Sequence, residues 1–213
     1  TKTSDQIAPF RAVLEATPYS VPVSYWDVQG TWSDDQTSNR WHITSTSLQE
    51  SSYPGLAAIT PQTPAAAGRP FRHALSFHGF SSSQNDVILG GDAPLNTKCL
   101  IVTRIKDRLA AVTPTALDRN TIAFVLHDAE GVFDIAGLNN RTVARRDLSG
   151  LSDDNIVNRL SSEGGIQLEQ SKAVRDSQTL RDAVAKGAAT ALGEVFNNTA
   201  PADACDVYGI DTN

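Results

Sequence analysis

Apolar residues recur at helical spacing in three segments of the chain. In residues 4–16 they fall three or four positions apart, which predicts a short amphipathic helix. Pro94 opens the second segment, whose apolar stripe runs to Leu109. The third is the longest: Ser177 can cap it, and the apolar stripe continues to Val195. These patterns predict three helices.

Short apolar runs predict strands between the helices, at residues 72–77, 87–89, 121–126 and 166–168. Residues 20–26 alternate apolar and polar side chains, and Pro22 places this expected strand at the edge of a sheet. Residues 54–70 hold four prolines, which indicates a surface excursion with a short helical turn. Strands that alternate with helices are typical of an α/β layer structure.

Length and composition narrow the class of protein. A chain of 213 residues fits one domain with a sizeable core. With 18 basic and 24 acidic residues the net charge is -6, and no basic block is present, so nucleic acid is not an expected partner. The apolar runs are too short to span a bilayer. The chain has no Met, so Thr1 is not a translation start and we expect sequence to precede it.

The cysteines and two glycosylation motifs bear on cellular location. Cys99 and Cys205 are the only thiols. They either form one bridge, as in secreted proteins, or are two small buried residues. Asn140 and Asn197 each begin an N-x-T motif, which agrees with export. No signal peptide is visible, as would also follow if processing had removed it.

Common catalytic motifs are absent from the sequence, which lacks G-x-S-x-G, H-E-x-x-H, the P-loop and G-x-G-x-x-G. His78 has the best local context of the four histidines, since it ends an apolar run and precedes a glycine. Ligand sites in α/β proteins gather at such strand ends. The alternative is a strand-end imidazole bonded to a backbone carbonyl.

The other three histidines have weaker contexts. His73 is an odd number of residues from His78, so it should point to the opposite face of the sheet. His127, followed by Asp128, indicates a solvent-exposed loop pair after a strand. The pattern around His42 is polar and aromatic and predicts no defined environment.

Glu169 is the carboxylate of most interest. It follows the short run 166–168, and a carboxylate at a strand end can act as a general base. The alternative is a simple ion pair with Lys172 or Arg175.

Asn155, Asn158 and Arg159 form a further polar cluster. An Asn and Arg pair suits a carboxylate, because the guanidinium binds both of its oxygens. Alone, the cluster would be an ordinary helix surface.

Five segments in this order resemble the poly-γ-glutamate hydrolase family. They are Arg40–Thr46, Ala74–Gly79, Val87–Gly91, Asn155–Arg159 and Gly165–Ser171, the last followed by Arg175. The resemblance extends from about Thr3 to Arg175. It implies a single α/β domain with a mixed sheet flanked by helices, similar to the zinc carboxypeptidases.

The resemblance also implies a zinc site. In that family a His and a Glu from an early H-G-G-x-I-E segment bind zinc with a second His from an S-x-H-G segment. His78 matches the second His. The early segment would fall just before Thr1, so we expect residues 1–213 to be a catalytic-type domain without its N-terminal strand and first ligand segment. The missing ligands would lie upstream or on a separated N-terminal peptide.

By the same resemblance, Glu169 is the general base that activates a zinc-bound water. A separate set of polar side chains is expected to bind the substrate. The residues expected to contact substrate are Asn155, Asn158, Arg159, Arg175 and, near the cleft, His42. Lys172 stands where the family usually has Arg. The sequence thus predicts a secreted, zinc-dependent hydrolase of γ-glutamyl amide bonds. The alternative is a metal-free protein that binds a carboxylate or polymer without turnover.

Overall fold

A computed structural model describes residues 3–27, 44–59, 71–112 and 117–210. His42, residues 30–39 and most of the expected excursion at 54–70 lie outside these ranges. The helices are α1 (Ile7–Leu14), α3 (Pro54–Ile59), α4 (Leu95–Ala110), α5 (Ile156–Leu160), α6 (Lys172–Asp176) and α7 (Gln178–Phe196). Single 3-10 turns are at Ser4–Gln6, Glu50–Ser52, Leu138–Asn140 and Asp206–Tyr208.

One mixed sheet forms the centre of the domain. Its strands are β1 (Ala74–Phe80), β2 (Asp86–Gly90), β3 (Ala123–Asp128), β4 (Gly131–Ile135) and β5 (Gly165–Ser171). Their spatial order is β1-β5-β2-β3-β4. β1 runs parallel to β5 and β2 parallel to β3, whereas β2 is antiparallel to β5 and β4 to β3. The expected α/β class with a mixed sheet is therefore confirmed.

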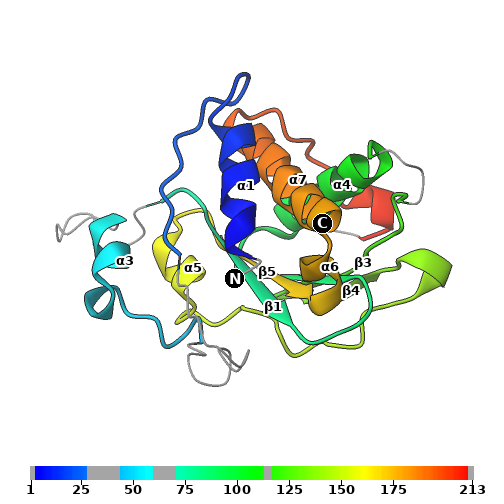
Figure 1. The fold of residues 1–213 in the computed structure, drawn as a ribbon, viewed down its shortest axis with the longest axis horizontal. Helices are drawn as coiled ribbons and strands as arrows, with labels where there is room; N and C mark the ends of the chain where they lie inside the picture. The colour runs from blue at the N-terminus through cyan, green and yellow to red at the C-terminus, as the bar shows by residue number, and fades with distance from the viewer. Residues whose placement is uncertain (1–2, 28–43, 60–70, 113–116, 211–213) are drawn as a thin grey trace.

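Helices α1, α4 and α7 cover one face of the sheet and lie together above it in Figure 1. The apolar stripes of these helices meet alternate strand residues, because successive side chains of a strand point to opposite faces. Val87, Phe124 and Leu168 are fully buried there. The three helices predicted from periodicity are confirmed, and Ser177 caps α7 by accepting a hydrogen bond from the Leu180 amide.

The opposite face of the sheet is covered differently. Helices α3 and α5 pack over one end of it, through Leu56 and Leu160 among others. Over the other end, Val143 and Leu148 pack from a loop against Phe80 of β1 and Ile88 of β2. Between these two apolar clusters the strands present polar side chains.

The strand expected at residues 20–26 does not form. The segment packs Val21 and Val23 partly against the main core, but it makes no strand pairing. Ser20 has a φ of 54°, which is outside the β region, and Pro22 has no N–H to donate to a ladder. Among the described residues, β1 is therefore an edge strand of the sheet, and β4 is the strand at the other edge.

Cys99 and Cys205 form a disulfide that joins α4 to the C-terminal segment. Of the two interpretations left open by the sequence, the structure contains the bridge. Both cysteines are also fully buried, within the main core. Among the described residues, no helix combines the length and apolarity needed to cross a membrane.

Candidate active site

His78 and Glu169 are neighbours on the polar part of the sheet. The two residues are register partners on the parallel strands β1 and β5, so their side chains leave the sheet on the same face. The His78 Nε2 atom lies 3.2 Å from the Ser45 hydroxyl, which belongs to the loop before α3. Two motifs that are 91 positions apart in the sequence thus meet at one place.

Glu169 is almost completely buried, with 7% of its surface exposed. Its Oε1 accepts a hydrogen bond of 3.0 Å from the Gln167 side chain. Burial raises the pKa of Glu169 to about 7, although Arg175, the Gln167 hydrogen bond and Arg145 oppose that rise. The carboxyl can therefore both take up and release a proton near neutral pH.

Asn155 orients Gln167 from the other side. The Asn155 Nδ2 atom donates to Gln167 Oε1 at 2.6 Å, which leaves the Gln167 amino group directed at Glu169. Asn155 also caps α5, because its Oδ1 accepts from the Val157 amide. All three side chains of this chain of hydrogen bonds are buried. Sequence reasoning missed Gln167, whose place in an apolar run gave no sign of its partner.

The Asn158 side chain forms hydrogen bonds with backbone groups. Its Nδ2 atom donates to the carbonyls of Gly150 and Ser152, each at 2.9 Å, and its Oδ1 accepts from the Asp92 amide. The residue is 1% exposed. In this conformation the Asn158 amide holds the loop before α5 in place.

The two arginines expected to bind substrate lie in different places. Arg159 donates to the Leu48 carbonyl at 2.5 Å, on the side of α5 that faces the loop with Ser45. Arg175 donates to the carbonyls of Gln170 and Phe80, at the end of β5 and β1. Gly79 makes room for it on the face of β1 opposite to His78, since a Cβ there would lie 2.2 Å from the Arg175 Nε atom.

Arg145 is a further cation at the site that sequence reasoning missed. Its guanidinium carbon lies 5.8 Å from the centre of the Phe80 ring, and its charge lowers the pKa of Glu169. Three arginines within residues 141–146 were the available signal. Lys172 is not a partner of Glu169, because its ammonium group bonds to Asp176.

Of the remaining histidines, His73 is separate from this site, whereas His127 lies on the same face of the sheet as Glu169 and interacts electrostatically with Asp147. His73 lies on the other side of the sheet as expected, where its ring packs edge-on against Phe196. The expectation that His127 is solvent-exposed is wrong: it lies in β3 and is 3% exposed. Asp128 is also not a free loop residue, since it pairs with the buried Lys98 at 2.8 Å. The apolar run of β3 continues through His127, which explains the error.

The described residues do not by themselves fit a catalytic zinc ion. Such an ion takes three protein ligands. Within the described ranges, no group of three or more His, Cys, Asp and Glu side chains could hold a metal. His78 has the chemistry of one ligand, and Glu169 is its nearest register partner on β5.

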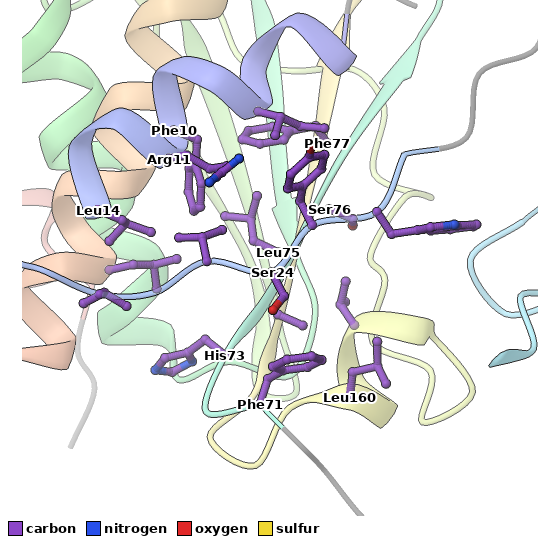
Figure 2. A pocket seen from close by; sticks show the side chains of 18 of the residues that line it. Phe10, Arg11, Leu14, Ser24, Phe71, His73, Leu75, Ser76, Phe77 and Leu160 are labelled. Carbon is purple, nitrogen blue, oxygen red and sulfur yellow. The ribbon is translucent and has the colours of Figure 1, made fainter. Parts of the chain in front are cut away.

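A cavity of about 710 Å³ lies along β1 and reaches His78. Figure 2 shows Phe10, Arg11 and Leu14 of α1 on one side of it, with Phe71 and Leu160 on the other. Its lining is mostly apolar, and it follows the edge of the sheet where the expected strand at 20–26 fails to pair. Glu169, on β5, lies one strand further into the sheet than this cavity.

Comparison with known proteins supports the family. Residues 126–198 match the sequence profile of the poly-gamma-glutamate hydrolase family, a range that includes Glu169, Asn155 and Arg175. This range contains two of the five motifs, Asn155–Arg159 and Gly165–Ser171, and bears out the expected resemblance there. No curated protein sequence matches the chain.

Two solved structures are similar to the chain. One is a bacteriophage poly-gamma-glutamate hydrolase, with 21% identity, a TM-score of 0.47, and coverage of 75% of this chain and 65% of that one. The other is a zinc-free apo form of YNDL, with 17% identity, a TM-score of 0.43, and coverage of 74% and 64%. The chain thus spans about two thirds or slightly less of the length of these structures.

Proposed function

We propose that the chain carries the general base and part of the substrate site of a hydrolase that cleaves γ-glutamyl amide bonds, in poly-γ-glutamate or a related peptide. The observation that carries the proposal is Glu169. It is a buried carboxyl with a pKa raised to about 7, it lies beside His78 in register, and it falls within the range that matches the hydrolase family.

Glu169 has the properties of a general base for water attack. A base works best when its pKa lies near the working pH, because it is then both deprotonated and basic enough. The ionised carboxylate takes a proton from water as the water oxygen attacks the amide carbonyl. The carboxyl then gives that proton to the leaving amine, which restores the carboxylate. Gln167 and Asn155 keep the accepting oxygen in one position.

We propose that the hydrolase depends on zinc, provided that another segment supplies two of the zinc ligands. His78 supplies one ligand, and a catalytic zinc needs two more. We keep the expectation that an H-G-G-x-I-E segment upstream of Thr1, or on a separated peptide, supplies them. Metal analysis of the complete gene product should then find about one zinc per chain. A product without that segment and without zinc would rule out the zinc-dependent mechanism.

Substrate carboxylates are proposed to bind at Arg175 and Arg159. The net charge of -6 repels a polyanion at long range, so binding must depend on local cations. Arg175 lies over Gly79, on the face of β1 opposite to His78, so its proposed contact with substrate is at the ends of β1 and β5. We assign Asn155 and Asn158 a positioning role, since their amides are already occupied.

The alternative function is binding of a γ-glutamyl polymer without turnover. It is favoured by one observation, namely that the described residues include one zinc ligand of the three required. The two functions differ in a simple assay. The hydrolase shortens poly-γ-glutamate, as seen by gel filtration and by release of free amines, and leaves poly-α-glutamate intact. The binding protein retains the polymer and leaves its length unchanged.

An extracellular location is proposed from the Cys99–Cys205 disulfide, since such bridges persist in oxidising compartments. Asn140 and Asn197 are both exposed, as glycosylation would require. Intact mass of the secreted protein before and after glycosidase treatment tests this modification. An unchanged mass would remove both sites.

A further inference from the structure

The loop that carries Arg145 is anchored on the same face of the sheet as Glu169. Val143 and Leu148, on either side of Arg145, pack against Phe80 and Ile88. Phe80 follows His78 by two residues on β1, so both side chains leave the sheet on one face. The guanidinium of Arg145, over the Phe80 ring, is therefore held next to the His78 and Glu169 pair.

Arg145 already binds a carboxylate with both arms of its guanidinium. Its Nε and Nη2 atoms donate to the two oxygens of Asp147, each at 2.7 Å. This two-point geometry is the one that arginine uses to recognise carboxylates. The two side chains are 43% and 63% exposed. Exposed pairs of this kind contribute little to stability, so another carboxylate can replace Asp147 at small cost.

The neighbouring arginines are used differently. Arg141 bonds to Asp86 and to the Asn85 carbonyl, which ties the loop to the start of β2. Arg146 bonds to Asp134, which ties the loop to β4. Arg145 instead pairs with a residue two positions further along its own loop. Because this ion pair lies within one loop, it does not tie the loop to another part of the fold. We therefore interpret the Arg145 guanidinium as a group that recognises a ligand.

A γ-linked glutamate chain presents the group that Arg145 would bind. Because the amide is formed through the side chain, every residue keeps a free α-carboxylate. A chain laid across Glu169 therefore places carboxylates on both sides of the amide that is cleaved. Arg145, above Phe80, lies on the same face of the sheet as Glu169 and acts electrostatically on it.

We propose that Arg145 binds an α-carboxylate of the γ-glutamyl substrate in exchange for Asp147, which acts as an internal competitor. The inference deepens the proposed function, on which it rests, by naming a specificity-determining residue of the same site. Removing the arginine should weaken substrate binding, whereas removing the competing carboxylate should strengthen it.

The test measures both hydrolysis and binding in the complete gene product. For poly-γ-glutamate hydrolysis, Arg145→Gln should raise KM about 10-fold and change kcat less than about twofold. The reason is that the lost contact binds the substrate and the transition state equally. Asp147→Asn should lower KM about threefold. Arg145→Lys, which keeps the charge and loses the fork, should lie between wild type and Arg145→Gln. Arg119→Gln removes a charge whose partner is Asp107, far from the loop, and should leave KM unchanged.

Calorimetric binding of γ-linked pentaglutamate separates this inference from the proposed function. A 10-fold weaker Kd for Arg145→Gln supports the inference even if no hydrolysis is observed. Hydrolysis together with an unchanged Kd for Arg145→Gln overturns the inference and leaves the hydrolase intact. An Asp147→Asn variant that weakens binding as much as Arg145→Gln also overturns it, because the pair would then be structural. Thermal unfolding of each variant confirms that it is folded.

Discussion

The two faces of the sheet differ in what covers them. On one face, α1, α4 and α7 bury an apolar surface in which Phe124 and Leu168 have no exposure. On the other, the described residues place α3 and α5 over one end and a loop over the other end, and Gln167 and Glu169 are buried polar residues of this face. Burying the Glu169 carboxyl on the second face costs stability, because desolvation disfavours its charged form. The apolar core that stabilises the fold and the candidate catalytic residues thus lie on opposite faces of one sheet.

The largest expected effect tests the apolar face. Phe124→Ala removes a fully buried ring from β3 and should lower the free energy of unfolding by about 4 kcal/mol. Val132→Ala, on the adjacent strand with 42% exposure, should change it by less than about 0.5 kcal/mol. Urea unfolding monitored by circular dichroism measures both. Equal effects of the two substitutions would contradict the assignment of the core to this face.

The second prediction concerns the cost of burying Glu169. Its pKa is 4.5 ordinarily and about 7 in the fold. Between these values the folded state binds more protons, so stability falls as pH rises through this window, by up to about 3 kcal/mol. Glu169→Gln should therefore be more stable than wild type at pH 8, and by much less at pH 4.5. Glu130→Gln, an exposed control, should change the free energy of unfolding at pH 8 by less than about 0.5 kcal/mol. A pH-independent difference for Glu169→Gln would contradict the raised pKa.

The third prediction isolates the orientation of Glu169. Asn155→Ser keeps a side chain that can cap α5 but loses the donor to Gln167. We expect kcat to fall about 10-fold, equivalent to about 1.4 kcal/mol, and the free energy of unfolding to fall by about 1–3 kcal/mol, because buried acceptors lose their donor. Steady-state kinetics and thermal unfolding measure the two quantities. A loss of stability with kcat unchanged would make Asn155 a structural residue only.

The smallest expected effect concerns Arg159, which lies at the α5 end of the polar face. Arg159→Ala should raise KM about fivefold, or about 1 kcal/mol, and leave the fold intact. Its guanidinium donates to the backbone carbonyls of Leu48 and Asp154, beside the loop that carries Ser45. An unchanged KM would show that substrate does not extend to this end of the face.

The sequence could predict the apolar face and only part of the polar face. Periodicity identified α4 and α7, because a helix that packs on a sheet must repeat its apolar residues every three or four positions. It did not identify α5, which has five residues, or β4, which is half exposed. Residues 20–26 alternate like a strand, yet pairing depends on the neighbouring backbone and not on the pattern alone.

The candidate site shows the same limit. His78 and Glu169 could be selected because each follows an apolar run and belongs to a motif of the family. Gln167 and Arg145 could not, since their roles arise from strand register and loop packing, which bring together residues distant in sequence. His127 was misjudged for the related reason that burial of a polar strand end depends on what covers it.

The central claim is that Glu169 is the general base of a γ-glutamyl hydrolase. The most direct test is cleavage of poly-γ-glutamate at pH 7.5 by the complete gene product and its Glu169→Gln variant, with binding of γ-linked pentaglutamate measured in parallel. We predict that Glu169→Gln lowers kcat by at least about 100-fold, as is typical when a general base is lost. The Kd for γ-linked pentaglutamate should stay within a few fold of the wild-type value. Turnover of Glu169→Gln at the wild-type rate would contradict the account.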